Sequence, residues 1–75
     1  MIQLYISEGY APGSKKLIGE FETNQEVAIA KNQWLIENGL KRTPYSSFWQ
    51  TSDGEIYEDF GSWHYFFITK EILKG

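Results

Sequence analysis

The sequence predicts an α+β domain with the order ββαβββ: two N-terminal strands, one helix, then a three-stranded antiparallel meander, with the helix on one sheet face. Three observations predict it. Apolar residues alternate near the N-terminus, a capped helical run follows, and three aromatic segments are separated by glycine turns. We expect a single domain over residues 1–75, in which aromatics (17% of residues) supply a thin core that no disulfide supports, because the chain has no cysteine.

The first two strands are expected on either side of a turn. Ile2, Leu4 and Ile6 alternate with polar neighbours, which predicts a half-buried strand. "EGYAPGS" is rich in turn residues, and "KKLIGEFE" is the second expected strand, where Gly19 indicates either a bulge or a weak strand. Whether these strands join the meander in one sheet stays open at this point.

The helix is predicted over "NQEVAIAKNQWLIEN". Thr23 and Glu26 have the spacing of a capping box, and Gly39 stands where a left-handed C-terminal cap is wanted. The side opposite Glu26 is expected to be buried. That buried side comprises Val27, Ala28, Trp34 and Leu35.

Two features depart from this simple helical pattern. Lys31 falls on the buried side, where its ammonium would have to reach outward past the apolar neighbours. Ile29 and Ile36 form a second apolar stripe, which is either part of a wide core face or an exposed patch.

Two glycine turns organise the aromatic segments. Asp53-Gly54 predicts a two-residue type I′ loop, and Gly61-Ser62 predicts a second one before the last strand, "WHYFFIT". Loops of this length would place Trp49 opposite Glu58. In the second hairpin they would place Phe60 opposite Trp63, Asp59 opposite His64, Tyr57 opposite Phe66 and Ile56 opposite Phe67.

This pairing sorts the aromatics onto two faces, of which one helix covers only one. The expected core face holds Tyr45, Trp49, Ile56, Phe60, Trp63, Tyr65 and Phe67. The expected open face holds Ile68 together with the residues of a candidate partner-binding set. That set consists of Phe48, Gln50, Tyr57, Asp59, His64 and Phe66. Its aromatic row is either a contact surface for a partner or ordinary cross-strand pairing that stiffens the sheet.

Catalytic, metal and cofactor sites are not expected. Asp59 with His64 resembles part of a hydrolase triad, but Ser62 lies in a predicted turn without a nucleophile elbow, so a structural ion pair is the preferred interpretation. The acidic residues of "DGEIYED" alternate faces and lack metal-ligand spacing. We therefore predict a non-enzymatic protein without cofactor or metal.

Charge and hydropathy restrict the partners. The formal net charge is −3 and the basic residues are scattered, whereas nucleic-acid binders usually carry a basic stripe. No leader pattern and no run of apolar residues long enough to span a bilayer is recognisable. We expect a cytoplasmic protein that does not enter membranes.

The segment "IYEDFGSWHYFFI", preceded by a capped helix ending in "WLIENG", resembles small uncharacterised proteins of phages and prophages of Gram-positive bacteria. In these proteins a hairpin with Asp-(Tyr/Phe)-Gly-Ser precedes an aromatic last strand. The matching residues are Asp59, Phe60, Gly61, Ser62, Phe66 and Phe67, within roughly the C-terminal two-thirds of the chain. The resemblance implies no activity and favours a phage-encoded accessory or host-directed protein.

The leading functional expectation is a small protein-binding module that captures a protein partner or associates with itself through the aromatic row. The alternative is binding of single-stranded nucleic acid, with bases stacked on the aromatic sheet face. The acidic net charge favours the first.

Overall fold

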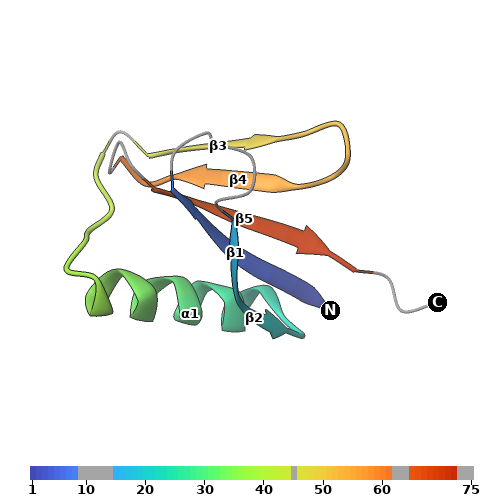
Figure 1. The fold of residues 1–75 in the computed structure, drawn as a ribbon, viewed down its shortest axis with the longest axis horizontal. Coiled ribbons are helices and arrows are strands. Elements are labelled where there is room, and N and C mark those ends of the chain that lie inside the picture. Colours follow the sequence, from blue (N-terminus) through green and yellow to red (C-terminus); the bar gives the residue numbers. More distant parts are fainter. Residues whose placement is uncertain (9–14, 45, 62–64, 73–75) are drawn as a thin grey trace.

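The computed structural model describes residues 1–8, 15–44, 46–61 and 65–72. Its elements confirm the predicted order and class: β1 (Ile2–Glu8), β2 (Lys16–Phe21), α1 (Asn24–Glu37), β3 (Ser47–Gln50), β4 (Ile56–Asp59) and β5 (Tyr65–Glu71). All five strands belong to one antiparallel sheet in the order β2-β1-β5-β4-β3. The N-terminal strands therefore join the meander through β1 and β5 (Figure 1).

The helix begins and ends where its capping residues predict. The backbone N–H of Glu26 donates to the Thr23 hydroxyl at 3.1 Å, so this oxygen satisfies one free donor of the first turn. At the other end Gly39 has φ +66°, and the N–H of Leu40 donates to the Leu35 carbonyl at 2.9 Å. These contacts form a Schellman cap, which needs the left-handed conformation that glycine adopts without strain.

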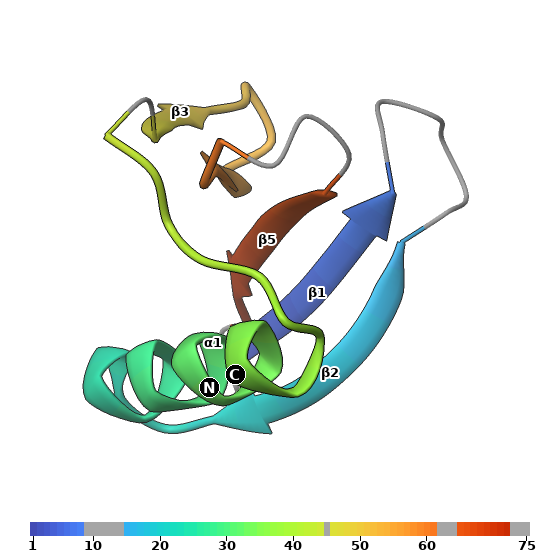
Figure 2. The ribbon, with the colours of Figure 1, turned by 90° about the vertical axis from the view of Figure 1, so that its left-hand side faces the viewer.

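The core lies between α1 and one face of the sheet (Figure 2). Its fully or nearly fully buried residues are Leu4, Ile6, Val27, Leu35, Phe60 and Phe67. Trp34 packs edge-on against three rings, at centroid distances of 6.3 Å from Phe60, 5.5 Å from Tyr65 and 5.5 Å from Phe67. Trp34 thus joins the helix to the last strand. Ala28 is exposed rather than buried, and the Ile29/Ile36 stripe is an exposed patch, at 52% and 78% exposure.

The first meander hairpin corrects the predicted register by one residue. The N–H of Thr51 donates to the Glu55 carbonyl at 2.9 Å, so residues 52, 53 and 54 form the loop rather than Asp53-Gly54 alone. Gly54 has the expected positive φ, at +88°, as in a turn that ends in a bulge. Phe48 therefore lies opposite Glu58, and Trp49 lies opposite Tyr57. Because side chains alternate with a period of two, the extra loop residue moves every β3 side chain to the other face.

The second hairpin is displaced by two residues. Asp59 pairs with Phe66, Tyr57 with Ile68 and Ile56 with Thr69, in place of the predicted Tyr57–Phe66 and Ile56–Phe67 pairs. The predicted turn and the Phe60–Trp63 and Asp59–His64 pairs involve residues 62–64, which lie outside the described residues. An even displacement leaves each β5 side chain on its expected face, so Tyr65 and Phe67 remain on the helix side.

These registers correct the expected composition of the two faces. Trp49 lies on the face away from the helix, and Phe48 and Gln50 lie on the helix side. Phe66 lies on the predicted open face but is 3% exposed, so the expectation that it is exposed was wrong. Trp49 contributes to this burial, because its ring meets the Phe66 ring edge-on at 5.8 Å now that β3 presents it on this face. Tyr45, Trp63 and His64 lie outside the described residues.

Candidate protein-interaction surface

The outer edge of β3 is the first component of the candidate surface. The described sheet ends at β3, whose other side pairs with β4, and all four β3 residues are exposed. Phe48 is 63% exposed, which is unusual for a large apolar ring at the edge of a sheet. Backbone donors and acceptors at such an edge are available to another strand.

The two edges of the described sheet differ in how well they are protected against pairing with another strand. β2, at the opposite edge, carries the exposed charges of Lys16 and Glu20 and a register irregularity opposite Leu4 and Tyr5. Such charges and bulges are the usual means by which proteins prevent edge-to-edge pairing. The segment 46–52 around β3 contains no charged residue and no proline. The β3 edge is thus the one suited to accept a strand.

A groove lies beside this edge, lined by residues of α1 and of the β3–β4 hairpin. It has a volume of about 400 Å³, and we call it the β3 groove. Its apolar lining comprises Val27, Ala28, Phe48 and Ile56, and its charged lining comprises Lys31, Arg42 and Glu58. Ile56 is 44% exposed and lies in this groove together with the exposed Phe48 ring. An apolar wall beside a charged floor is typical of sites that receive side chains.

A buried ion cluster forms the floor of the groove. The Glu58 side chain is only 2% exposed, and its carboxylate accepts hydrogen bonds from Lys31 Nζ at 3.0 Å and from Arg42 Nε at 2.8 Å. Arg42 Nη2 adds a longer contact of 3.5 Å to the other oxygen, so the guanidinium meets the carboxylate side-on. The two cations and one carboxylate leave this cluster with a net charge of +1.

The electrostatics of Glu58 are set by two opposing effects. Burial acts to raise the pKa of the Glu58 carboxyl, because it removes the charged form from water. The hydrogen bonds from Arg42 and Lys31 outweigh this effect, and the pKa lies below its usual value of 4.5. Glu58 is therefore ionised at neutral pH and fixes both cations at the groove.

Arg42 is held in position by the chain around it. The next residue, Thr43, donates its backbone N–H to the Phe60 carbonyl at 3.0 Å, which ties the helix-to-β3 connection to the end of β4. Gly61 permits this approach, because a Cβ there would stand 1.9 Å from Thr43 Oγ1. Arg42 Nη1 also donates to Asn32 on the helix. The guanidinium is thus oriented at the groove while its side chain stays 36% exposed.

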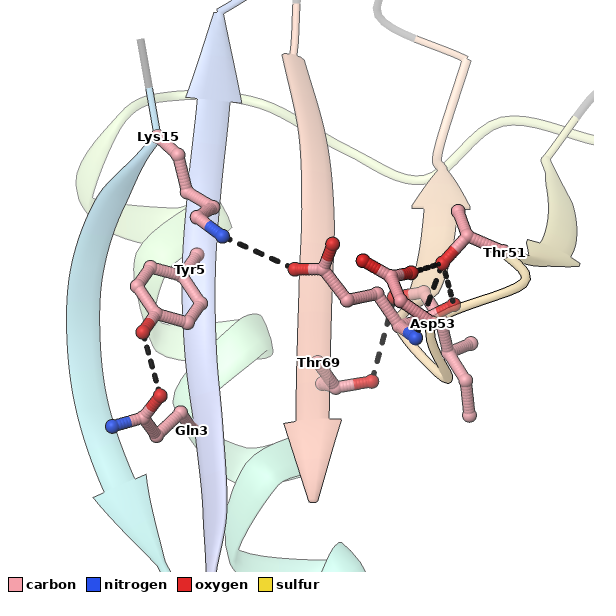
Figure 3. Close-up of polar contacts among 8 residues, drawn as sticks. Gln3, Tyr5, Lys15, Thr51, Asp53 and Thr69 are labelled. Atoms are coloured by element: carbon pink, nitrogen blue, oxygen red, sulfur yellow. Dashed lines mark hydrogen bonds and ion pairs between the residues drawn. The ribbon is translucent and has the colours of Figure 1, made fainter. Parts of the chain in front are cut away.

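Aromatic rings cross the sheet on the face away from the helix. Tyr5, Ile68, Tyr57 and Trp49 stand opposite one another on successive strands, and Trp49 stacks on Tyr57 with centroids 5.4 Å apart. A cation also lies on this face, because Lys15 Nζ is 4.5 Å from the Tyr5 ring centroid. Lys15 pairs with Glu55 at 3.1 Å (Figure 3), and this hydrogen bond raises the pKa of Lys15. The charge above the rings is therefore neutralised within the chain.

The residues predicted for partner binding are divided between the two faces. Phe48 and Gln50 are exposed on the helix side, whereas Tyr57 and Asp59 are half-buried on the other face beside the buried Phe66. Asp59 Oδ1 accepts the N–H of Gly61 at 2.7 Å, and the proposed His64 partner lies outside the described residues. The described members of the predicted set therefore lie on two different faces of the sheet rather than on one surface.

The ion cluster was not recognised from the sequence, although a signal for it existed. Glu58 alternates with Ile56 and Phe60, both of which were assigned to the core face, so its carboxylate had to point inward. Lys31 also stood on the buried side of the helix. Opposite charges on two facing apolar surfaces predict an ion pair, and Glu58 with Lys31 satisfies that pattern.

Other kinds of site receive no support from the described part of the chain. There, no cluster of three or more histidine, cysteine or carboxylate side chains is placed to hold a metal ion. The single described helix is too short and too polar to cross a membrane. No protein-family model, no curated protein and no solved structure matches this chain.

Proposed function

We propose that the chain is a small non-catalytic protein-binding module that engages its partner through the β3 edge and the β3 groove. The observation that carries the proposal is the 63% exposure of Phe48 at an unprotected sheet edge, beside a groove with an apolar wall. Aromatic side chains are frequent anchors of protein interfaces. An open edge supplies main-chain hydrogen bonds to an incoming strand, and a neighbouring groove supplies selectivity for its side chains.

The aromatic face offers less support for single-stranded nucleic acid. Binding of that kind combines stacking rings with a positive groove along the backbone. Here Lys15 is paired with Glu55, and Trp49 stacks on Tyr57. The charge of Lys15 is therefore already neutralised and the Trp49 ring is already stacked within the chain. The β3 edge is the better candidate for a binding site.

The test uses a library of random peptides displayed on a carrier and selected against the purified chain. We expect enriched peptides whose addition shifts the backbone amide resonances of residues 46–51 and of the groove. Phe48→Ser should weaken their binding about tenfold or more, because it removes the aromatic anchor. Ile36→Ser is the matched control: it removes a 78%-exposed apolar side chain from the helix and should leave binding unchanged.

Two results would contradict the proposal. The first is the absence of any enriched peptide that shifts the β3 amides. The second is tight, steeply salt-dependent binding of a single-stranded oligonucleotide that is lost on Tyr57→Ser, which would instead establish the nucleic-acid alternative.

The resemblance of the C-terminal two-thirds to phage proteins supports a further part of the proposal. We infer a phage-encoded accessory or host-directed protein that acts in the cytoplasm, where a chain without cysteine needs no oxidising environment. Detection of the chain in the soluble cytoplasmic fraction of infected or lysogenic cells would test this part independently of the binding site.

A further inference from the structure

Strand addition to β3 would direct alternate side chains of the ligand into the β3 groove. Phe48 and Gln50 point to the helix side of the sheet, so ligand residues paired with them would point the same way. One of these positions would contact the exposed apolar surface of Phe48 and Ile56. The ligand would therefore place an apolar side chain there and a second side chain farther along the groove.

The charge of the groove indicates the chemical character of the second ligand side chain. The groove contains two cations, Lys31 and Arg42, and one anion, Glu58, on a chain whose overall formal charge is −3. A guanidinium has five N–H donors, and the hydrogen bonds to Glu58 and Asn32 within the described residues use three of them. Arg42 thus retains donors and surface exposure, and a carboxylate is the group that matches a guanidinium edge.

We propose that the ligand of the β3 groove is an extended peptide segment carrying an acidic side chain and an apolar one on the same face of the strand, at alternate positions. The apolar side chain packs on Phe48 and Ile56, and the carboxylate pairs with Arg42. Glu58 orients the guanidinium from below, and the backbone of the segment pairs with the β3 edge. This inference rests on the proposed function and specifies the chemistry of its ligand.

A second copy of the chain fits this site less well. Pairing of two β3 strands would bring Phe48 and Gln50 of the other copy to the groove, because these are the β3 residues on the helix side. The segment 46–52 contains no carboxylate. Such a dimer would satisfy the backbone edge but not Arg42.

The experiment combines a selected peptide with matched substitutions on both sides. An enriched peptide is compared with its counterpart in which the acidic residue is amidated, Glu→Gln or Asp→Asn, by calorimetry against the wild-type chain. We expect binding to weaken about fivefold, the upper end for a partly exposed charge pair. Arg42→Gln should cause a similar loss with the acidic peptide and little further loss with the amidated one, the signature of direct pairing.

Lys41→Gln is the matched control, because it removes an exposed positive charge from the adjacent position. It should change affinity by about twofold or less. The amidated peptide needs no protein variant, so the comparison remains decisive even if Arg42→Gln, which also removes a partner of Glu58, reduces folding. Circular dichroism identifies that case.

The possible failures are distinguishable. Peptides that shift the β3 amides but bind equally well after amidation would overturn the acidic-ligand inference and leave the proposed function intact. The absence of peptides that bind at β3 would overturn both. A wild-type chain that sediments as a dimer, and becomes monomeric on Phe48→Ser, would show that the occupant is a second copy and would also overturn the inference.

Discussion

Glu58 is the residue at which the interior of this small protein departs most from an ordinary apolar core. A carboxylate that is 2% exposed is costly to desolvate and persists only with hydrogen-bonded partners. Lys31 and Arg42 supply them from the helix and from the connection that follows it. The helix, the connection that follows it and β4 thus meet at the Glu58 side chain. The floor of the groove therefore forms only when these three segments are folded together.

The lowered pKa of Glu58 predicts a pH dependence of stability. A carboxyl whose folded-state pKa lies below its unfolded value of 4.5 contributes stability that is complete above that value. This contribution is lost as the pH falls through the lower, folded-state pKa. We therefore expect the free energy of unfolding of the wild-type chain, measured with urea, to fall below about pH 4.5.

Glu58→Gln isolates the contribution of this group. The variant should be less stable at neutral pH, because both cations lose their carboxylate, and its stability should fall less steeply in acid. Glu20→Gln, at an exposed position on β2, is the control and should retain the acid dependence of the wild type. Parallel pH profiles for wild type and Glu58→Gln would show that Glu58 is not the titrating group.

At the scale of the elements, loop length decides which side chains a strand presents. The Asp53-Gly54 pair correctly indicated a turn with positive φ, but the loop includes residue 52 as well. One additional residue reversed both faces of β3 and placed Phe48 at the groove instead of on the open face. The displacement of β5 by an even number of residues had no such effect on its faces.

Gly54 allows a test of the first turn that involves no steric clash. A Cβ at this position would meet no atom of the described residues within 4 Å, so the cost of a substitution arises from the φ of +88°. Gly54→Val should destabilise the chain by about 1–3 kcal/mol, because a β-branched residue rarely adopts this conformation. Gly54→Asn should cost less, since asparagine tolerates positive φ. Equal urea midpoints for the two variants would mean that the turn adopts another conformation in solution.

At the scale of the whole molecule, the sheet buries side chains on both faces although one helix covers only one of them. Phe66 and Ile68, on the face away from the helix, are 3% and 2% exposed. Rings from neighbouring strands and the Lys15–Glu55 pair lie on that face. A domain of 75 residues has little interior, so this second buried layer is a substantial part of its stability.

The relative importance of Phe66 and Trp49 follows from this arrangement. Phe66→Ala should cost about 3–5 kcal/mol, which is enough to unfold much of a marginal domain. Trp49→Ala should cost less, because Trp49 is 37% exposed on the edge strand. Urea unfolding followed by far-UV circular dichroism measures both. If Trp49→Ala lowered the free energy of unfolding more than Phe66→Ala, the result would agree with the register predicted from the sequence. It would contradict the position of β3 in the structure.

The sequence by itself determined the features that depend on local patterns. Alternation in β1, the Thr23 and Gly39 caps of the helix, and the positive φ of Gly54 each arise from residues close together in the chain. The inward side of β4 and β5 was also predictable, because it follows from alternation within one strand.

The tertiary structure decided what depends on distant segments. The face of β3 followed from loop length, which the turn dipeptide did not determine, and this face brought the Trp49 ring against Phe66. The ion cluster required Lys31, Arg42 and Glu58 to meet across the sheet and helix. Side-chain alternation specifies the two faces of a strand, but only packing and loop length specify which partner each face meets.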